Sequence, residues 1–470
     1  MEGVDPMLAM ASSTGVVADS SPNAVALSVC DVQQLQVMSL TNPINPLLLA
    51  SACVGSSAAL DFLFRREDNQ EAPMVMPTQD FLGLLAGNAP GNGTRRRVSV
   101  PQASGSVEDG VDQPSFPSAS RLLTGVAADG GTALHVVASH GDDAEFLKCA
   151  TIVSKRDQGL LFAVNKKGDT PLHCAARAGK SKMVSFLIKL AERCNRLHEL
   201  LRKENVLMET ALHDGVRVGR NDIVELLLGA DPDLANHPEQ ATSPLYLAIL
   251  MRRDDTAQAL HDKSNGNLSY SGPNGQNALH AATFQGSGIK KLVNWNNSLT
   301  IHGDRDGSTP LHLASSFQNH TSFKQLFEAN PAPTYQADNN GFLPIHVAAS
   351  VGRKKTISII LKKFPSSAGL RTGQGRTFLH VAVVKKRLNI VSFVCQNPSL
   401  ASILNMQDND GNTALHLAVK VSSLRIFCSL YRNKEVCLSL TNNSEETPVD
   451  LARNYLPCGM HYNWVILSHL

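Results

Sequence analysis

The hexapeptide Thr309-Pro-Leu-His-Leu-Ala314 decides the fold, because close variants of it recur along the chain at nearly constant spacing. Its first residue marks ten such units, and successive markers are separated by 32 to 40 residues. The ten markers are Thr132, Thr170, Thr210, Ser243, Asn277, Thr309, Leu343, Thr377, Thr413 and Thr447. A period near 33 residues predicts a stack of similar units, which we number repeats 1 to 10, rather than a single globular core.

Each position of the hexapeptide has a structural reason. Nine of the ten markers are Thr, Ser or Asn, whose side-chain oxygen can accept a hydrogen bond from an amide in the first turn of a helix. Leu343 is the exception. Pro at the second position, as in Pro171 and Pro310, suits the first residue of a helix because the missing N–H has no helical partner there. The Leu and Ala positions then face inward, and small residues such as Ala175 let neighbouring inner helices approach closely.

Three further signals complete the unit. Nine residues after the marker, five repeats carry a glycine, which is typical of a helix that ends in a left-handed conformation. Apolar pairs then recur with the spacing of an amphipathic helix, as in residues 183–188. Two residues before the marker, seven repeats carry a glycine that indicates a β-turn, which we call the finger. The five glycines after the marker are Gly141, Gly179, Gly219, Gly286 and Gly352.

This helix, turn, helix and finger unit resembles the ankyrin repeat. We therefore predict an all-α ankyrin-repeat solenoid of about ten repeats over residues 125–455, with a largely disordered N-terminal arm. Residues 1–45 and 67–120 are rich in Ser, Gly, Pro and Ala, and we expect a disordered arm and a disordered linker there. Residues 46–66 read as an ankyrin-like pair of short helices broken near Gly55, which either caps the array or floats. Residues 456–470 are expected to form a C-terminal tail.

Composition and charge favour a soluble protein with protein partners. The formal net charge is only +2, which argues against nucleic acid as the partner, because such proteins carry a concentrated basic face. Nine cysteines occur without a Cys-x-x-Cys pair, and no signal peptide precedes them, so we expect reduced thiols in a cytoplasmic protein. No run of about 18 apolar residues occurs, so we expect no transmembrane segment in this chain.

Apparent chemical sites have structural explanations. The motif histidines occupy one equivalent position in each repeat, so we expect them to hydrogen-bond the finger and the marker rather than to bind a metal. Residues 304–308 and 408–412 begin like a calcium loop but lack its later Gly and Glu, so we expect fingers there. No phosphate loop, nucleophile elbow or His-Glu-x-x-His motif occurs. We therefore expect no enzymatic activity and no catalytic residue, cofactor, metal or small-molecule substrate.

Two sets of residues are candidate functional sites. Repeat proteins bind partners on extended concave surfaces, and the seventh and eighth residues after the marker fall on that surface in an ankyrin array. Exposed aromatic and arginine side chains are enriched at binding hot spots. The candidate partner-binding residues are Arg177, Arg217, Phe284, Phe317 and Lys385. Separately, Arg96-Arg97-Val98-Ser99 fits a basophilic kinase site, with Ser99 as the phosphate acceptor, or else is a plain solvated charge run.

The resemblance narrows further. Residues 130–150, GGTALHVVASHGDDAEFLKCA, and residues 165–191 look like the first repeats of the plant ankyrin family typified by Accelerated Cell Death six, and the segment PLLLASACVGS at 46–56 resembles that family's opening repeat. The resemblance implies a role in plant defence and cell-death signalling linked to salicylic acid. Members of that family continue into a membrane domain, and this chain ends at Leu470 without one, so we expect a shortened member or a soluble paralogue.

Two functional hypotheses follow from this resemblance. The first is a cytoplasmic, non-enzymatic scaffold for other proteins. The second is a soluble regulatory subunit that associates with membrane-spanning ankyrin relatives in a transport or channel-like complex, and so lies peripherally at the plasma membrane through its partners.

Overall fold

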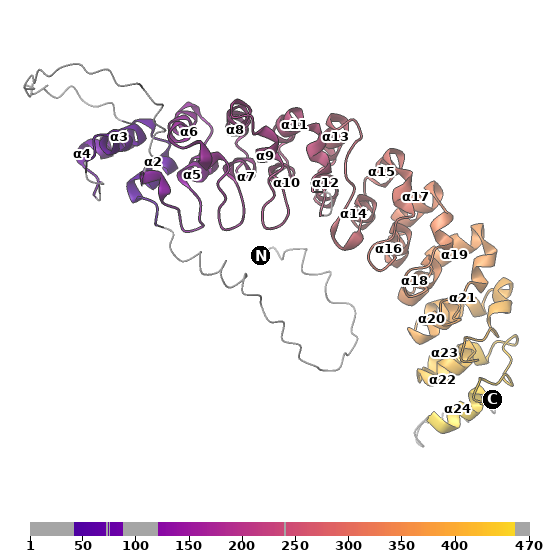
Figure 1. Ribbon diagram of the computed structural model, residues 1–470. Helices are drawn as coiled ribbons and strands as arrows, with labels where there is room; N and C mark the ends of the chain where they lie inside the picture. Colours follow the sequence, from indigo (N-terminus) through magenta and orange to yellow (C-terminus); the bar gives the residue numbers. More distant parts are fainter. Residues whose placement is uncertain (1–41, 72–73, 75, 88–120, 239–240, 456–470) are drawn as a thin grey trace, which may run out of the picture. The chain divides into compact units, whose positions relative to one another are not determined.

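The computed structural model describes residues 42–71, 74, 76–87, 121–238 and 241–455. Within these ranges the regular elements are helices, joined by turns and by isolated bridges such as the one between Ser271 and Asn277. Figure 1 shows successive helix pairs stacked along the chain. The prediction of an all-α ankyrin-repeat solenoid is confirmed.

The first helix of each repeat, the inner helix, starts directly after its marker. Inner helices of neighbouring repeats contact one another from α5 through to α24. Their Leu and Ala positions are buried, as for Leu311 and Ala314, so small residues do let the helices pack closely. The inner helices are α5 (Ala133–His140), α7 (Pro171–Arg177), α10 (Ala211–Val218), α12 (Pro244–Leu250), α14 (Ala278–Gln285), α16 (Pro310–Ser316), α18 (Pro344–Val351), α20 (Phe378–Val384), α22 (Ala414–Lys420) and α24 (Pro448–Tyr455).

The second helix of repeats 1 to 9, the outer helix, packs back on its own inner helix. Its apolar stripe faces inward, as in repeat 2, where Met183, Val184, Leu187 and Ile188 are buried. The outer helices are α6 (Ala144–Arg156), α8 (Ser181–Arg193), α11 (Asn221–Ala230), α13 (Asp254–Lys263), α15 (Ile289–Trp295), α17 (Thr321–Ala329), α19 (Lys354–Lys363), α21 (Leu388–Cys395) and α23 (Leu424–Tyr431).

Short helical turns connect most outer helices to the next finger. In repeat 2 this connection is the α-helix α9 (Leu197–Leu201), which makes the step to the next marker longer. The 3₁₀ turns η3 (Gln158–Leu161), η4 (Pro232–Asn236), η6 (Asn297–Thr300), η7 (Ala332–Tyr335), η8 (Pro365–Gly369) and η9 (Pro398–Ile403) make the same connection in repeats 1, 3 and 5 to 8, whereas η5 (Pro273–Gly275) lies within the finger before Asn277 and η2 (Arg121–Thr124) precedes the first finger.

The fingers are joined to one another at their tips by backbone hydrogen bonds. Lys166 N–H donates to the Asp129 carbonyl over 2.9 Å, and Val206 N–H donates to the Lys167 carbonyl over the same distance. The same bond joins later fingers, for example from Asn339 to Asp306 over 2.9 Å. These bonds fix the register between neighbouring repeats.

Four of the five glycines expected to end the inner helices do adopt the left-handed conformation, with φ between 71° and 82°. Gly141 differs, because its φ of −157° is extended. The ring of Phe146 explains why a glycine stands here although its φ is not positive. A Cβ at Gly141 would lie 2.3 Å from that ring. Glycine is required at this position by close packing rather than by a positive φ.

Two N-terminal helices, α2 (Pro46–Val54) and α3 (Ser57–Asp68), pack against the first repeat. Helix α2 contacts α5 and α3 contacts α6, and Ile44 N–H donates to the Val126 carbonyl over 2.9 Å. Gly55 joins the two helices with a φ of 75°, and its missing side chain leaves room for the Phe146 ring. The pair therefore covers the apolar edge of repeat 1.

Two predicted boundaries are wrong. Ile44 and Asn45 do not belong to a disordered arm, since Ile44 is buried and Asn45 caps α2. The predicted linker 67–120 contains a further helix, α4 (Gln79–Leu85), which packs against α3. Thr78 caps α4, and Phe81 is fully buried with its ring centroid 6.3 Å from that of Phe62, so a single aromatic residue anchors this short helix.

The rest of the predicted arm and linker, residues 1–41 and 88–120, and the predicted tail 456–470 lie outside the described residues. Among the helices that the structure describes, none has the length and apolar character needed to cross a bilayer.

Candidate functional site

The motif histidine of eight repeats joins its own repeat to the next. In repeat 6, His312 Nδ1 accepts a hydrogen bond from the Thr309 N–H over 3.1 Å, and Nε2 lies 3.0 Å from the Phe342 carbonyl. Because Nδ1 is the acceptor, the proton of the neutral ring sits on Nε2 and is donated to the carbonyl. The eight histidines are His135, His173, His213, His280, His312, His346, His380 and His416.

These contacts determine the protonation of the histidines and their chemistry. Burial lowers the pKa of each of the eight, and it lowers the pKa of His346 and of His380 to about 4. Both ring nitrogens are engaged within the backbone, so neither is directed at a ligand. Within the described part of the chain, no group of three or more His, Cys, Asp or Glu side chains is placed to hold a metal ion.

The two loops that resemble the start of a calcium site are fingers. The Asp408 carboxylate accepts hydrogen bonds from the N–H groups of Asp410 and Asn412, over 3.1 and 2.9 Å. Asp304 accepts the same pair of bonds from Asp306 and Ser308. The carboxylate oxygens therefore close the turn of the finger.

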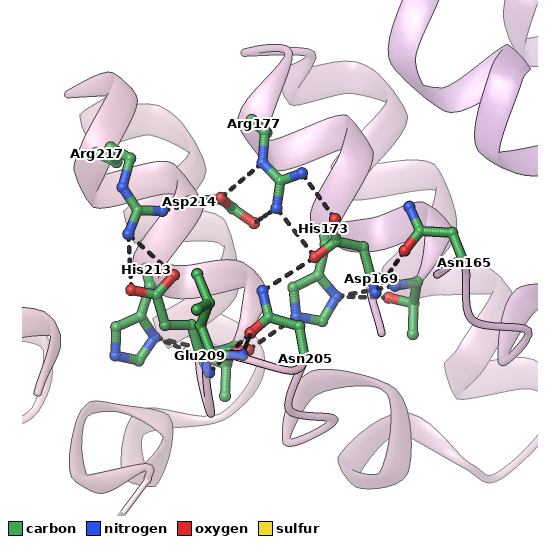
Figure 2. Close-up of polar contacts among 12 residues, drawn as sticks. Asn165, Asp169, His173, Arg177, Asn205, Glu209, His213, Asp214 and Arg217 are labelled. Carbon is green, nitrogen blue, oxygen red and sulfur yellow. Dashed lines mark hydrogen bonds and ion pairs between the residues drawn. The ribbon is translucent and has the colours of Figure 1, made fainter. Parts of the chain in front are cut away.

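Arg177, a predicted partner-binding residue, lies between two buried carboxylates (Figure 2). Its guanidinium forms one two-pronged contact with Asp169 of its own finger, at 2.7 and 3.0 Å, and another with Asp214 of α10, at 3.0 and 3.0 Å. Both carboxylates are fully buried, whereas the Arg177 side chain is 39% exposed. The residue thus ties repeat 2 to repeat 3.

Arg217, the equivalent residue of repeat 3, joins the same network. It contacts Asp214 at 3.2 Å and both oxygens of Glu209 at 2.7 and 2.9 Å. Burial acts to raise the pKa of Asp169, but the hydrogen bonds from Arg177 and Asn205 outweigh it and hold that pKa below its usual value. Burial instead raises the pKa of Asp214. Both predicted arginines have intramolecular partners.

The aromatic candidates lie next to one another. Phe284 is in the last turn of α14 and is 48% exposed, and Phe317 directly follows α16 and is half-buried. Their ring centroids are 6.2 Å apart at 65°, an edge-to-face arrangement. We call these two residues the aromatic pair. Lys385, the fifth candidate, caps the end of α20 and is exposed. Ser99 lies outside the described residues.

Sequence reasoning missed the apolar finger of repeat 3, Val206-Leu207-Met208. These side chains are 72%, 71% and 48% exposed at the tip of the finger. Met208 occupies the left-handed position, with a φ of 57°, where the preceding finger has Gly168 with a φ of 75°. The signal was present in the sequence, because the preceding finger has Lys166, Lys167 and Gly168 at the same positions.

A groove of about 340 Å³ lies between α2, α5 and α7, close to this finger and to Arg177. Polar and apolar groups line it together, including Cys53, His140, Lys167 and Cys174. The groove therefore lies at the N-terminal end of the row of inner helices.

Three curated relatives are similar to part of this chain. The ANK repeat-containing protein nipk-1 of Caenorhabditis elegans is 27% identical over 152 residues, 31% of this chain and 24% of the relative. The tyrosine-protein kinase HTK16 of Hydra vulgaris is 30% identical over 168 residues, 34% of this chain and 21% of the relative. A Caenorhabditis elegans homolog of transient receptor potential cation channel subfamily A member 1 is 29% identical over 168 residues, 35% of this chain and 13% of the relative. The chain therefore spans about a quarter or less of these relatives.

One solved structure and two family models also match parts of this chain. The crystal structure of the ankyrin repeat domain of Bcl-3 is 22% identical, with a TM-score of 0.29, over 61% of this chain and 95% of that one. A family model of ankyrin repeats in three copies matches residues 113–198, 134–237, 212–300 and 286–368, and a model of ankyrin repeats in many copies matches residues 400–452. These matches cover more than half of the 470 residues, and the chain belongs to the ankyrin repeat family.

Proposed function

We propose that this protein is a non-enzymatic scaffold that binds another protein through the ends of its inner helices, with the aromatic pair at the centre of the contact. Ankyrin repeats support a role in protein–protein interaction. The observation that carries the proposal is that Phe284, which is 48% exposed, lies in edge-to-face contact with Phe317 of the next repeat, so that two rings form one apolar contact at the inner-helix ends. Aromatic rings of this kind supply a large apolar contact at low cost in side-chain entropy.

Truncation of both rings tests the proposal. We expect Phe284→Ala with Phe317→Ala to weaken partner binding by more than about 2 kcal/mol, because hot-spot aromatics contribute at that level. The Leu279 and Leu311 side chains that pack between repeats are untouched, so the melting temperature should stay close to that of the wild type. The measurement compares the proteins retained by wild type and variant in quantitative affinity purification.

Tyr335→Ala is the matched control, since Tyr335 is also 48% exposed but lies in η7, after the outer helix α17. It should retain the wild-type set of bound proteins. Recovery of the same proteins in equal amounts with the Phe284→Ala and Phe317→Ala double variant would contradict the proposal. Unfolding of that variant would mean that the rings act in packing between repeats instead.

The biological setting that we propose is plant defence and cell-death signalling linked to salicylic acid. Its support is the resemblance of residues 46–56, 130–150 and 165–191 to the Accelerated Cell Death six family. A plant in which the gene is disrupted should show altered lesion formation after salicylic acid treatment, and re-expression of the wild-type chain should restore it. Wild-type lesions in the disrupted plant would contradict this setting.

A second candidate is a regulatory subunit for membrane-spanning ankyrin relatives. The similarity to a protein named as a cation channel, 29% over 168 residues, favours it. Cell fractionation separates the two candidates: a cytoplasmic pool supports the scaffold, whereas sedimentation with membranes that depends on a membrane-spanning relative supports the subunit and a peripheral position at the plasma membrane.

A further inference from the structure

A long segment of repeats 7 and 8 has no acidic residue. Between Asp338 and Asp408 the sequence has neither Asp nor Glu but ten lysines and arginines. The whole chain has a net charge of only +2, so the remainder carries −8 against +10 in this segment. The ten residues are Arg353, Lys354, Lys355, Lys362, Lys363, Arg371, Arg376, Lys385, Lys386 and Arg387.

Six of these residues form what we call the basic ridge, residues 353–355 and 385–387. Residues 385–387 form the turn between α20 and α21, whereas Arg353 lies in the turn between α18 and α19 and Lys354 and Lys355 begin α19. Arg353 is half-buried and the other five are exposed. The junctions between the inner and outer helices of two successive repeats thus present six positive charges.

Hydrogen bonds between repeats hold the two turns in order. Arg387 donates through Nε to the Ser350 carbonyl over 2.8 Å, and Asn389 donates to the Gly352 carbonyl over 2.7 Å. Arg353 makes the equivalent bond to the Ser316 carbonyl of repeat 6, also over 2.8 Å. Inner helices pack about 8–10 Å apart, so neighbouring turns lie within roughly one screening length at physiological salt.

The charges of the basic ridge are not neutralised within the described residues. None of its six side chains lies within ion-pair distance of a described carboxylate, and the acid-free segment makes one such pair, between Arg376 and Asp408 in the fingers. The arginines of repeats 2 and 3 behave differently, because Arg177, Arg217 and Arg220 each pair with a carboxylate. Three arginines of the first repeats thus have carboxylate partners, whereas the six side chains of the basic ridge have none among the described residues.

The basic ridge continues the line of the aromatic pair. Ser316, whose carbonyl receives Arg353, directly precedes Phe317, and Phe317 contacts Phe284 of repeat 5. The order along the inner-helix ends is thus aromatic in repeats 5 and 6, then basic in repeats 7 and 8. A segment bound along this line meets an apolar contact first and positive charge next.

We propose that the basic ridge binds an acidic segment of the partner protein, and that an apolar residue next to that segment docks on the aromatic pair; this rests on the proposed scaffold function. Charge complementarity identifies the occupant. Single-stranded nucleic acid would call for exposed aromatic side chains among the positive charges themselves, on which successive bases stack, and a membrane surface would call for exposed apolar side chains there that insert. Among the described residues, the strongly exposed large apolar side chains include none between Asn339 and Gln407. A protein segment supplies both the carboxylates and the apolar residue.

The two residue types of the ridge bind carboxylates differently. Arginine can hold both oxygens of a carboxylate, whereas lysine acts as a point charge on a flexible stem. Such charges at the edge of an interface raise the association rate and select the partner, and salt weakens both effects. Binding of the acidic segment should therefore fall as the salt concentration rises.

The test uses the full chain and a short fluorescent peptide with one leucine followed by consecutive glutamates, and the same peptide with glutamine in place of glutamate. By fluorescence anisotropy, we expect the dissociation constant of the glutamate peptide to be at least about tenfold lower than that of the glutamine peptide. This difference should shrink between about 50 and 300 mM salt. Lys355→Glu with Lys385→Glu should weaken binding of the glutamate peptide by about tenfold or more. Both lysines are exposed, and circular dichroism should show an unchanged melting temperature.

Lys189→Glu with Lys324→Glu is the matched control, because it makes the same change in charge at exposed positions of the outer helices α8 and α17. It should leave binding of the glutamate peptide within about twofold. Equal weakening by both double variants would mean that net charge alone drives binding, and would overturn the proposal. Equal binding of the glutamate and glutamine peptides would overturn it too.

Two further arms separate the other occupants and the proposed function. If phosphatidylserine vesicles or duplex DNA respond to the Lys355→Glu and Lys385→Glu variant while the glutamate peptide does not, the ridge binds a lipid surface or nucleic acid and the proposal is wrong. If the Phe284→Ala and Phe317→Ala variant keeps all bound proteins while the lysine variant loses peptide binding, the proposed role of the aromatic pair fails and the ridge stands. If instead the Phe284→Ala and Phe317→Ala variant loses bound proteins while the lysine variant keeps peptide binding, only the proposal for the basic ridge is rejected.

Discussion

At the scale of single residues, Arg177 matters most to the stability of the first repeats. Asp169 and Asp214 come from different repeats, and each is fully buried. A buried carboxylate without a partner destabilises the fold. Removing one partner of a buried ion pair therefore lowers the free energy of unfolding more than replacing both partners by apolar residues does. The same guanidinium satisfies both carboxylates, so its loss affects two repeats at once.

We therefore expect Arg177→Met to lower the free energy of unfolding by about 2 to 3 kcal/mol, below the full value for a buried pair because solvent reaches Arg177. Asp214→Asn in the same chain should restore about 1 kcal/mol, because it removes one of the two buried charges that have lost their contact with Arg177. Urea denaturation of the wild type, both single variants and the double variant measures this coupling. Strictly additive effects would show that the two side chains are independent.

Sequence alone predicted the contact between some of these residues, but for others it predicted only the position. The neighbouring placement of Phe284 and Phe317 follows from their similar distances after the marker, the seventh and the eighth residue, and the structure places the rings in contact. The same spacing put Arg177 and Arg217 at the inner-helix ends, but it could not show their partners. Asp214 reaches Arg177 only because neighbouring inner helices pack side by side, and that contact depends on side-chain direction rather than on spacing.

At the scale of elements, repeats 4 and 5 differ from the others. Repeat 4 has Tyr246 in place of the motif histidine, and its hydroxyl donates to the side chain of Gln276 over 2.7 Å instead of to a backbone carbonyl. The outer helix of repeat 5, α15, has seven residues, of which Ile289 and Leu292 are buried. The outer helix of repeat 2, α8, has 13 residues, of which five are buried. Less apolar surface thus holds α15 in place.

We expect amide hydrogen exchange to be faster in helices α12 to α15 than in α7 and α8. In a repeat array each unit is stabilised only by its neighbours, so a weak repeat opens locally. Exchange followed by mass spectrometry at peptide resolution measures the difference. Equal protection in the two regions would contradict the prediction.

The elements that sequence reasoning missed are those without a periodic signal. Helix α4 has seven residues and one fully buried aromatic residue, Phe81, so no apolar period distinguishes it from a linker. Gly141 matches the other helix-ending glycines in position, but it is needed for the approach of Phe146, a contact invisible in the spacing. The repeats themselves were predictable because the same residues recur ten times.

At the scale of the whole molecule, the eight motif histidines make stability depend on pH. Each is neutral when folded, and burial holds its pKa below the ordinary 6.5. The unfolded chain therefore binds protons first as the pH falls. The stabilisation by these histidines is fully present above about pH 6.5 and is lost as the pH falls toward the folded-state pKa, about 4 for His346 and His380.

We expect the urea midpoint to fall steeply between about pH 7.5 and pH 5, since a histidine with a folded-state pKa near 4 loses about 2 kcal/mol by pH 5. His302→Asn is the control, because His302 is exposed and is not a motif histidine. That variant should keep the wild-type pH dependence. A midpoint that does not change over this range would show that the histidines are not buried as neutral rings.

The net charge of the whole molecule does not reveal how unevenly its charges are distributed along the chain. A net charge of +2 indicates no electrostatic partner, yet it is the sum of an acid-free segment of +10 and a remainder of −8. Because a repeat array separates distant segments in space, these charges do not cancel locally. Charge in such a protein has to be counted repeat by repeat.

The contact from the motif histidine to the next finger also bears on mechanics. Tension applied through partners at the two ends of the array would load the contacts between repeats in series, so each would carry the full force. Most of these contacts include a hydrogen bond from an imidazole to the backbone, whereas at the same position between repeats 4 and 5 the Tyr246 hydroxyl donates to the side chain of Gln276. Two side chains can rotate away from each other without disturbing a helix, so under tension this contact should break before the corresponding imidazole contacts, and the backbone bond from Ser243 to Ser271 would then carry the load between these two repeats.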